Sequence, residues 1–268
     1  MDDELVILGS GGGRHHIRTQ HRATGGLLYK FNGIQAHLDP GPGALVRLIQ
    51  YGEDPTKTEL FIVTHVHIDH FNDISAIIEA SREYLHDKEF NYFKKGTLIT
   101  TKDVLPFISN YHRKMLEKTI VFNTGATLDY KGVKITGTKV IHSPKIDGFG
   151  IKFELENYTI AFSSDTMVFK GFSEQFSGVD VLILHLLRPD SVTCRRHLCT
   201  DEVIPYLKKI YPPLKGLIIT HFGSYMDGFR SKDNKVPRQV EKLKNKTKIL
   251  NVISAEDGLK IKIKDLLK

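Results

Sequence analysis

The first part of the chain carries short apolar runs separated by turn residues, a pattern typical of β-sheet. Leu5–Leu8 is one such run. An Asn32-Gly33 dipeptide, which favours a two-residue hairpin turn, joins two more runs, Leu27–Phe31 and Ile34–Leu38. The run Leu60–Val63 is too short for a core helix, so it predicts a buried strand.

Apolar residues at helical spacing predict two helices on either side of that strand. The first covers Ala44–Tyr51. The second lies beyond the strand, and its apolar positions are Ile74, Ile77, Ile78 and Leu85. Two further strands are predicted at residues 98–101 and 119–122, with a helical segment between them.

From Leu128 onward the pattern becomes a β-meander, with turn signals at residues 130–132 and 156–157. Three buried strands are then predicted, at residues 160–162, 179–185 and 217–219. A helix is predicted at Asp201–Ile210. The last stretch favours a basic helix followed by a hairpin that turns at Asp257-Gly258.

These elements predict an α/β fold. Strands on both sides of a helical middle give a sandwich with helices outside. The 268 residues could form one large domain or two small ones, and the even spread of candidate ligands along the chain favours a single domain over residues 1–268.

The composition is that of an ordinary globular protein, with 40% hydrophobic and 26% charged residues. A net charge of +7 invites a polyanionic partner, but the 38 basic residues are scattered among 31 acidic ones, so charge alone leaves nucleic-acid binding open. Two cysteines give no disulfide framework, which favours a cytoplasmic protein. The N-terminus lacks a signal-peptide pattern, and no apolar run approaches the roughly 20 residues that cross a bilayer.

Candidate metal ligands are concentrated directly after the predicted strand Leu60–Val63. Three imidazoles and a carboxylate fall within six residues: His65, His67, Asp69 and His70. Neutral imidazoles and carboxylates suit zinc and other late first-row divalent metals. In an open α/β sheet, ligands bind just outside the carboxyl ends of strands. The alternative is a polar loop that is rich in histidine by chance, and this density of ligand-type residues argues against it.

The spacing His-x-His-x-Asp-His after a hydrophobic strand resembles the signature of the metallo-β-lactamase superfamily of binuclear metal hydrolases. Three later residues match the remaining ligands of that superfamily in order, each after an apolar run: His142, Asp165 and His221. The resemblance therefore spans nearly the whole chain. It implies a metallo-β-lactamase-type αβ/βα sandwich, with two mixed β-sheets flanked by helices.

The resemblance also implies how the ligands are divided. One ion would be held by His65, His67 and His142, a second by Asp69, His70 and His221, and Asp165 would bridge them. Two divalent ions are therefore expected, Zn²⁺ first, with Mn²⁺ or Fe²⁺ as alternatives. Iron redox chemistry is disfavoured, because the flavodiiron branch carries Glu at the position of His67.

The catalytic residues implied by the resemblance are Asp69 and His197. A hydroxide activated by the two ions would be oriented by Asp69. His197 matches the histidine that protonates the leaving group in the ribonuclease Z and cyclic-phosphodiesterase branches, and a histidine without a role is the alternative.

Three features near the amino terminus have more than one interpretation. The glycine run Gly9–Gly13 would allow the backbone to approach a ligand closely or to line an anion site. Residues Arg14–Arg22 are predicted as a mobile, substrate-facing loop. The alternative is that they are surface residues without a function. Asp39 resembles the aspartate that supports metal ligands without binding the ion, or it is a turn residue before Pro40.

Other histidines and both cysteines are also open to interpretation. His185 ends a buried strand on the expected active-site side, as a functional residue or as a satisfied core histidine. His86 and His112 match no ligand position and are interpreted as surface histidines. Cys194 and Cys199 flank His197, and free thiols are favoured over a metal site.

The favoured function is a metal-dependent phosphodiesterase acting on RNA or a small cyclic phosphate. Two departures argue against a tRNA-processing ribonuclease Z: Leu186 stands where that family has Glu, and no long Gly/Pro-rich arm fits between Asp165 and His185. The alternatives are a thioester or lactone hydrolase of the glyoxalase II or lactonase type, and a non-enzymatic metal-binding scaffold. The substrate is expected to be a phosphodiester or another small ester, nucleic acid and a homo-oligomer are allowed, and no membrane association is expected.

Overall fold

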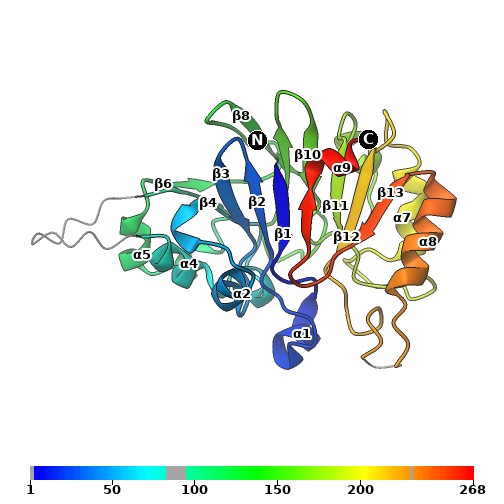
Figure 1. Cartoon of the computed structure of the whole chain (residues 1–268), viewed down its shortest axis with the longest axis horizontal. Coiled ribbons are helices and arrows are strands. Elements are labelled where there is room, and N and C mark those ends of the chain that lie inside the picture. The colour runs from blue at the N-terminus through cyan, green and yellow to red at the C-terminus, as the bar shows by residue number, and fades with distance from the viewer. Residues whose placement is uncertain (1–2, 83–94, 230–231) are drawn as a thin grey trace, which may run out of the picture.

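The structure, a computed structural model, describes residues 3–82, 95–229 and 232–268. In these residues two β-sheets face each other and helices cover their outer faces (Figure 1). The prediction of an αβ/βα sandwich with two mixed sheets is confirmed. Within the same residues, no helix combines the length and the apolar character that crossing a bilayer requires.

The first sheet has seven strands in the described residues, in the order β14-β1-β2-β3-β4-β5-β6. Its strands are β1 (Glu4–Ile7), β2 (Leu27–Phe31), β3 (Ile34–Leu38), β4 (Thr58–Val63), β5 (Thr97–Thr100), β6 (Lys118–Val121) and β14 (Lys260–Lys262). The helices that accompany it are α1 (Gly13–Thr19), α2 (Ala44–Gln50), α3 (Ile68–Phe71), α4 (Ile74–Ala80) and α5 (Asn110–Met115). Leu85 and His86 lie outside the described residues.

The second sheet also has seven described strands, in the order β13-β12-β11-β10-β9-β8-β7. Its strands are β7 (Thr127–Tyr130), β8 (Val133–Thr138), β9 (Gly150–Glu154), β10 (Thr159–Phe162), β11 (Val181–His185), β12 (Gly216–Thr220) and β13 (Asn251–Ser254). The accompanying helices are α6 (Phe172–Gln175), α7 (Thr200–Leu207), α8 (Val236–Thr247) and α9 (Ile263–Leu266). The predicted meander is confirmed, because β7 to β10 pair antiparallel in succession.

Four central strands are buried along their whole length. Every residue of β3, β5, β11 and β12 is buried, as expected for strands covered on both faces. One apolar core fills the space between the sheets, and two others lie between each sheet and its helices. The edge strands β6 and β7 are instead largely exposed.

Parallel pairing brings the functional segments to one edge of the sandwich. Strands β3 to β6 are parallel neighbours, and so are β10 to β13. Their carboxyl ends therefore share an edge, which is where ligands bind in open α/β sheets. The loops that carry the candidate ligands begin at these ends.

Two local predictions are wrong. Residues 13–19 form helix α1 instead of a loop, although Arg14 and His15 do line the cleft. The buried His16 holds the helix in place, and its Nε2 lies 3.0 Å from Asp227 Oδ2. The final hairpin does not form, because β13 pairs with β12 and β14 pairs with β1 in the other sheet. Asp257 anchors this crossing by accepting hydrogen bonds from the backbone N–H groups of Ser10 and Ala23.

Candidate metal centre

The predicted ligands leave the ends of strands in both sheets and meet between them. His65, His67, Asp69 and His70 follow β4 in the first sheet. His142, Asp165 and His221 follow β8, β10 and β12 in the second sheet. The structure brings all seven side chains together at one edge.

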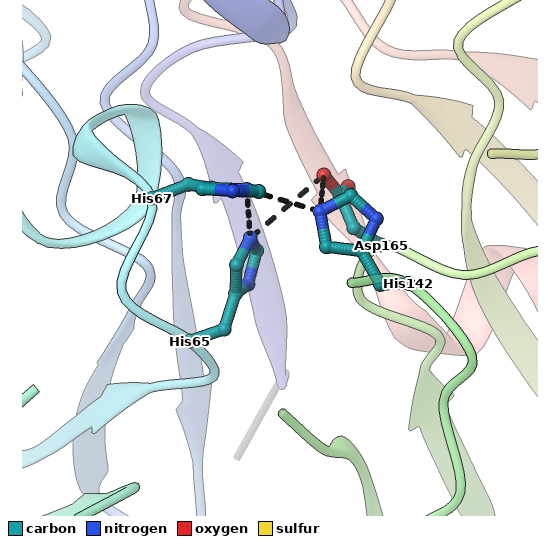
Figure 2. A group of neighbouring side chains, drawn as sticks. All are labelled: His65, His67, His142 and Asp165. Carbon is teal, nitrogen blue, oxygen red and sulfur yellow. Dashed lines mark hydrogen bonds and ion pairs between the residues drawn. The ribbon is translucent and has the colours of Figure 1, made fainter. Parts of the chain in front are cut away.

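One group consists of His65, His67, His142 and Asp165, whose ligand-type atoms lie within 4.8 Å of one another. Figure 2 shows their rings and the carboxylate turned toward a common point. His67 Nδ1 lies 3.0 Å from both His65 Nε2 and His142 Nε2. Asp165 Oδ2 is 3.9 Å from His65 Nε2 and 3.7 Å from His142 Nε2.

A second group shares Asp165 and adds His70, His221 and His185. The Nε2 atoms of His70 and His221 are 3.2 Å apart, and Asp165 approaches them to 3.6 Å and 3.3 Å. Asp69 Oδ2 lies 3.4 Å from His221 Nε2. Asp165 therefore stands between two sets of ligand-type atoms.

Hydrogen bonds behind the rings determine which nitrogens carry lone pairs. His70 Nδ1–H donates to Asp39 Oδ2 at 2.8 Å, and His142 Nδ1–H donates to the carbonyl of Arg196 at 3.0 Å. Thr64 gives its hydroxyl proton to Asp39, so it accepts from His65 Nδ1–H at 3.1 Å. In neutral rings the three Nε2 atoms are then unprotonated and face the other imidazoles at close range. A cation among them satisfies these lone pairs, so the residues fit a metal ion.

The electrostatics lead to the same conclusion. Burial lowers the pKa of His65 well below its ordinary value and also lowers the pKa of His67, which keeps both rings neutral, as ligation requires. Burial also lowers the pKa of His70, but Asp39, Asp69 and Asp165 outweigh it and raise that pKa well above normal. Three carboxylates thus favour positive charge at this point, which a bound cation would supply.

The comparisons with known proteins agree with this geometry. The family model described as beta-lactamase superfamily domain matches residues 36–222, which is well over half of the chain. The chain belongs to the metallo-β-lactamase superfamily. The family and the fold predicted from the ligand motif are both confirmed.

Two relatives show how far the similarity extends. The uncharacterized protein MJ1374 of Methanocaldococcus jannaschii is 30% identical over 266 residues, covering 98% of this chain and 96% of the relative. A UPF0173 metal-dependent hydrolase of Sulfolobus acidocaldarius is 28% identical over 115 residues, covering 42% of this chain and 45% of that protein. The prediction of a metal-dependent hydrolase of the metallo-β-lactamase superfamily is confirmed at this level.

Three solved structures share the fold over nearly their whole length. The metallo-β-lactamase fold protein YhfI of Bacillus subtilis has a TM-score of 0.75 at 19% identity, covering 97% of this chain and 99% of that one. The short form of human tRNase Z has a TM-score of 0.69 at 16% identity, covering 96% and 98%. A diphosphatase of the PhnP family has a TM-score of 0.66 at 16% identity, covering 97% of each.

In this metallo-β-lactamase-type centre three residues have left-handed backbone conformations that side chains rarely adopt. The φ angles are 50° at Asp39, 54° at Ser164 and 61° at His221. Such conformations persist when the surrounding contacts hold them, and they are concentrated at functional sites. Ser164 helps to hold this region by donating a hydrogen bond to Thr64 Oγ1 at 2.7 Å, which links the two sheets.

The structure shows why one residue of the predicted glycine run, Gly12, is a glycine. A Cβ at this position would lie 2.2 Å from Cε1 and Nδ1 of the His221 ring. Its backbone φ of −142° suits any residue, so glycine is needed for space alone. The close approach predicted for this run is therefore made to a candidate ligand side chain. The backbone of Gly12 also donates to the carbonyl of Phe222 at 3.0 Å, which holds the two segments together.

We expect Gly12→Ala to displace the His221 ring and to weaken binding of the ion on its side by about 10- to 100-fold, as loss of ligand support does at other metal sites. Ions held by His65, His67 and His142 should be much less affected. Zn²⁺ titration with a competing chromophoric chelator measures both affinities. An unchanged pair of dissociation constants would contradict this account.

His197 lies at the mouth of the site. Its Nδ1 is 3.7 Å from Asp165 Oδ2, and its ring contacts the ring of His142 at a centroid distance of 4.7 Å. It lines a cleft of about 620 Å³ together with His67, Asp69 and Asp165. The side chain is 20% exposed, so a substrate in the cleft can reach it.

The sequence left open whether His185 is a functional residue, and the structure places it in contact with Asp165. Its Nδ1 donates to Asp165 Oδ1 at 2.8 Å, and its ring stacks on His221 at 4.4 Å. The signal for it was the end of a buried strand at the same edge as the ligands. Neither cysteine belongs to a ligand group in the described residues: Cys199 is buried at the start of α7, and Cys194 lines the cleft. His112 lies on α5 near Glu79, away from the centre.

Proposed function

We propose that the chain is a binuclear metal phosphodiesterase that cleaves RNA or a small cyclic phosphate. The observation that carries the proposal is the position of Asp165, a buried carboxylate shared by two sets of ligand-type atoms. A shared carboxylate can hold two ions about 3.5–4 Å apart, the separation found in two-metal sites. His65, His67 and His142 would hold one ion, and Asp69, His70 and His221 the other.

A pair of divalent ions supplies an activated water at neutral pH and neutralises charge on the phosphoryl oxygens. The protein's own residues do the rest. Asp69 is held by the backbone N–H of Gly13, which donates to its Oδ2 at 2.6 Å, and this fixes the carboxylate that would orient the nucleophile. His197 faces the cleft, where it would donate a proton to the departing oxygen.

His197 must be protonated to act as an acid. Burial lowers its pKa to about 4, although Asp165 opposes this effect. An anionic phosphodiester bound beside the ring stabilises the imidazolium and raises that pKa. This requirement favours a negatively charged substrate over a neutral thioester or lactone, and it supports phosphodiester cleavage.

The proposal does not extend to processing of tRNA precursors. Leu186 is fully buried and offers no carboxylate to His197. Residues 166–184 hold the short helix α6, whose Phe172 and Phe176 are buried in the core outside the second sheet. This segment has no room for a tRNA-gripping arm, so shorter RNA or a cyclic phosphate is the preferred substrate.

The test is hydrolysis of bis-p-nitrophenyl phosphate before and after metal removal. We expect chelation to abolish turnover, and Zn²⁺ or Mn²⁺ to restore it by about 100-fold or more, because the ions supply several kcal/mol of transition-state stabilisation. Elemental analysis of the active protein should find two ions per chain.

The alternatives give different results in the same series. Turnover of S-lactoylglutathione or a homoserine lactone, without turnover of the phosphodiester, would identify a thioester or lactone hydrolase. If protein with two bound ions turned over none of the three substrates, the result would favour a non-enzymatic metal-binding scaffold.

A further inference from the structure

Arg188 is a cationic side chain that lines the cleft. It lies three residues beyond the end of β11 and lines the same cleft as His197 and Asp165. In residues 3–82, 95–229 and 232–268 no carboxylate pairs with it, and its Nε is buried without a hydrogen-bond acceptor. The terminal N–H groups of its guanidinium make no hydrogen bond or ion pair in the described residues and are not buried, so these are the groups that an acceptor in the cleft would meet.

Tyr225 holds the Arg188 side chain in a defined orientation. The guanidinium carbon lies 4.5 Å from the centroid of the Tyr225 ring, and both residues line the cleft. A stacked guanidinium is covered on one face, while its N–H groups point outward in its own plane. That arrangement suits two parallel hydrogen bonds to a phosphate.

Backbone contacts fix this pair relative to the candidate metal centre. The backbone N–H of Arg188 donates to the carbonyl of Leu198 at 3.2 Å, next to His197. The N–H of Gly223 donates to the carbonyl of Leu187 at 3.0 Å, and a Cβ at Gly223 would lie 2.9 Å from that oxygen. The loop that follows His221 is thus packed against the segment after β11, which carries Arg188.

The charge of the cleft wall favours an anion at this position. Two arginines line the cleft, Arg14 and Arg188. The carboxylates that line it are Asp69 and Asp165, and both face the candidate ion sites. The other charged side chains of the lining, Arg14 and Arg188, are both positive. The volume of the cleft, about 620 Å³, lies within the range that accommodates a nucleotide-sized ligand.

We propose that Arg188 binds a second, unreacting phosphate of the substrate, and that Tyr225 positions Arg188 for this contact. The inference rests on the proposed phosphodiesterase function and narrows its substrate class. The substrate is then a phosphodiester that carries another phosphate group close to the scissile one, as in a short nucleic-acid strand, in place of a small ester with a single phosphate.

The test compares two substrates that differ only in that phosphate: p-nitrophenyl thymidine 5′-phosphate, and the same ester with a phosphate on the other sugar hydroxyl. The metal-loaded protein should prefer the second. Arg188→Gln should raise KM for the second substrate by about 10- to 100-fold, as expected for loss of a charged hydrogen-bond donor, and should leave the first within about twofold.

Arg18→Gln is the matched control, because Arg18 is exposed on α1 and does not line the cleft. It removes the same charge and should leave the preference intact. Equal losses on both substrates in Arg188→Gln, or no loss on either, would overturn the proposal. Tyr225→Ala should reduce the preference without changing turnover of the first substrate, and an unchanged preference would remove Tyr225 from the proposal.

A binding measurement separates this inference from the proposed function. Calorimetric titration with thymidine 3′,5′-bisphosphate and with thymidine 5′-phosphate needs no turnover. If neither ester is hydrolysed, the phosphodiesterase proposal fails. The second phosphate site still stands if the bisphosphate binds more tightly and Arg188→Gln removes that advantage. If the advantage is absent, or survives in Arg188→Gln, the site is wrong.

Discussion

Replacing Asp165 by alanine is expected to lower the metal content and to reduce kcat by about 1000-fold or more, a loss of roughly 4 kcal/mol in transition-state stabilisation. The carboxylate is central to the cluster, since its oxygens lie between 2.8 and 3.9 Å from histidine nitrogens of both ligand groups. Burial opposes its charge, but His221, His197 and His70 outweigh this and hold the pKa of Asp165 well below normal. It is therefore a carboxylate at neutral pH.

Asp165→Asn is the sharper variant, because it keeps the shape of the side chain and removes its charge. Elemental analysis and p-nitrophenyl phosphodiester kinetics measure both effects. Asp190→Asn is a matched control, since Asp190 is a paired carboxylate outside both ligand groups, in the segment after β11, and is bound to Lys242 and Arg238 of α8. Two tightly held ions in Asp165→Asn would contradict the bridging role.

His197→Ala is expected to keep both ions and to lose about 100- to 10,000-fold in kcat, the usual contribution of a general acid. His197 contacts Asp165 only at 3.7 Å and is the more exposed of the two, so its removal leaves the ligands in place. The loss should be smaller for a p-nitrophenyl ester than for a dinucleotide, because an alkoxide leaving group needs protonation more.

The dependence on leaving group distinguishes proton donation from a purely structural role, which would slow both substrates equally. His112→Ala serves as the control, since His112 is a histidine on α5 that pairs with Ser109 and Glu79. A kcat within twofold of the wild type on both substrates would remove His197 from the mechanism.

The strands and most candidate ligands could be predicted from the sequence, because each signal is local. Leu60–Val63 and its following histidines combine a buried strand with ligand-type side chains at its carboxyl end. The same combination recurs before Asp165 and His221. Parallel pairing then brings the ends together without further information.

The features that escaped prediction depend on contacts between distant segments. Helix α1 is held by His16 against Asp227, which lies more than 200 residues away along the chain. The partner of β14 is β1, and hydrophobic alternation specifies which face of a strand is buried but not its neighbour. The contact between Gly12 and His221 has the same origin, since only the folded chain brings the glycine to the ring.

The candidate ligands are divided between the two halves of the sandwich. His65, His67 and His70 belong to the first sheet, whereas Asp165 and His221 belong to the second. An ion coordinated by residues of both sets would link the two sheets. Metal binding and the packing of the sheets against each other would then stabilise one another. We therefore expect the supply of the ion to affect the stability of the folded chain as well as its activity.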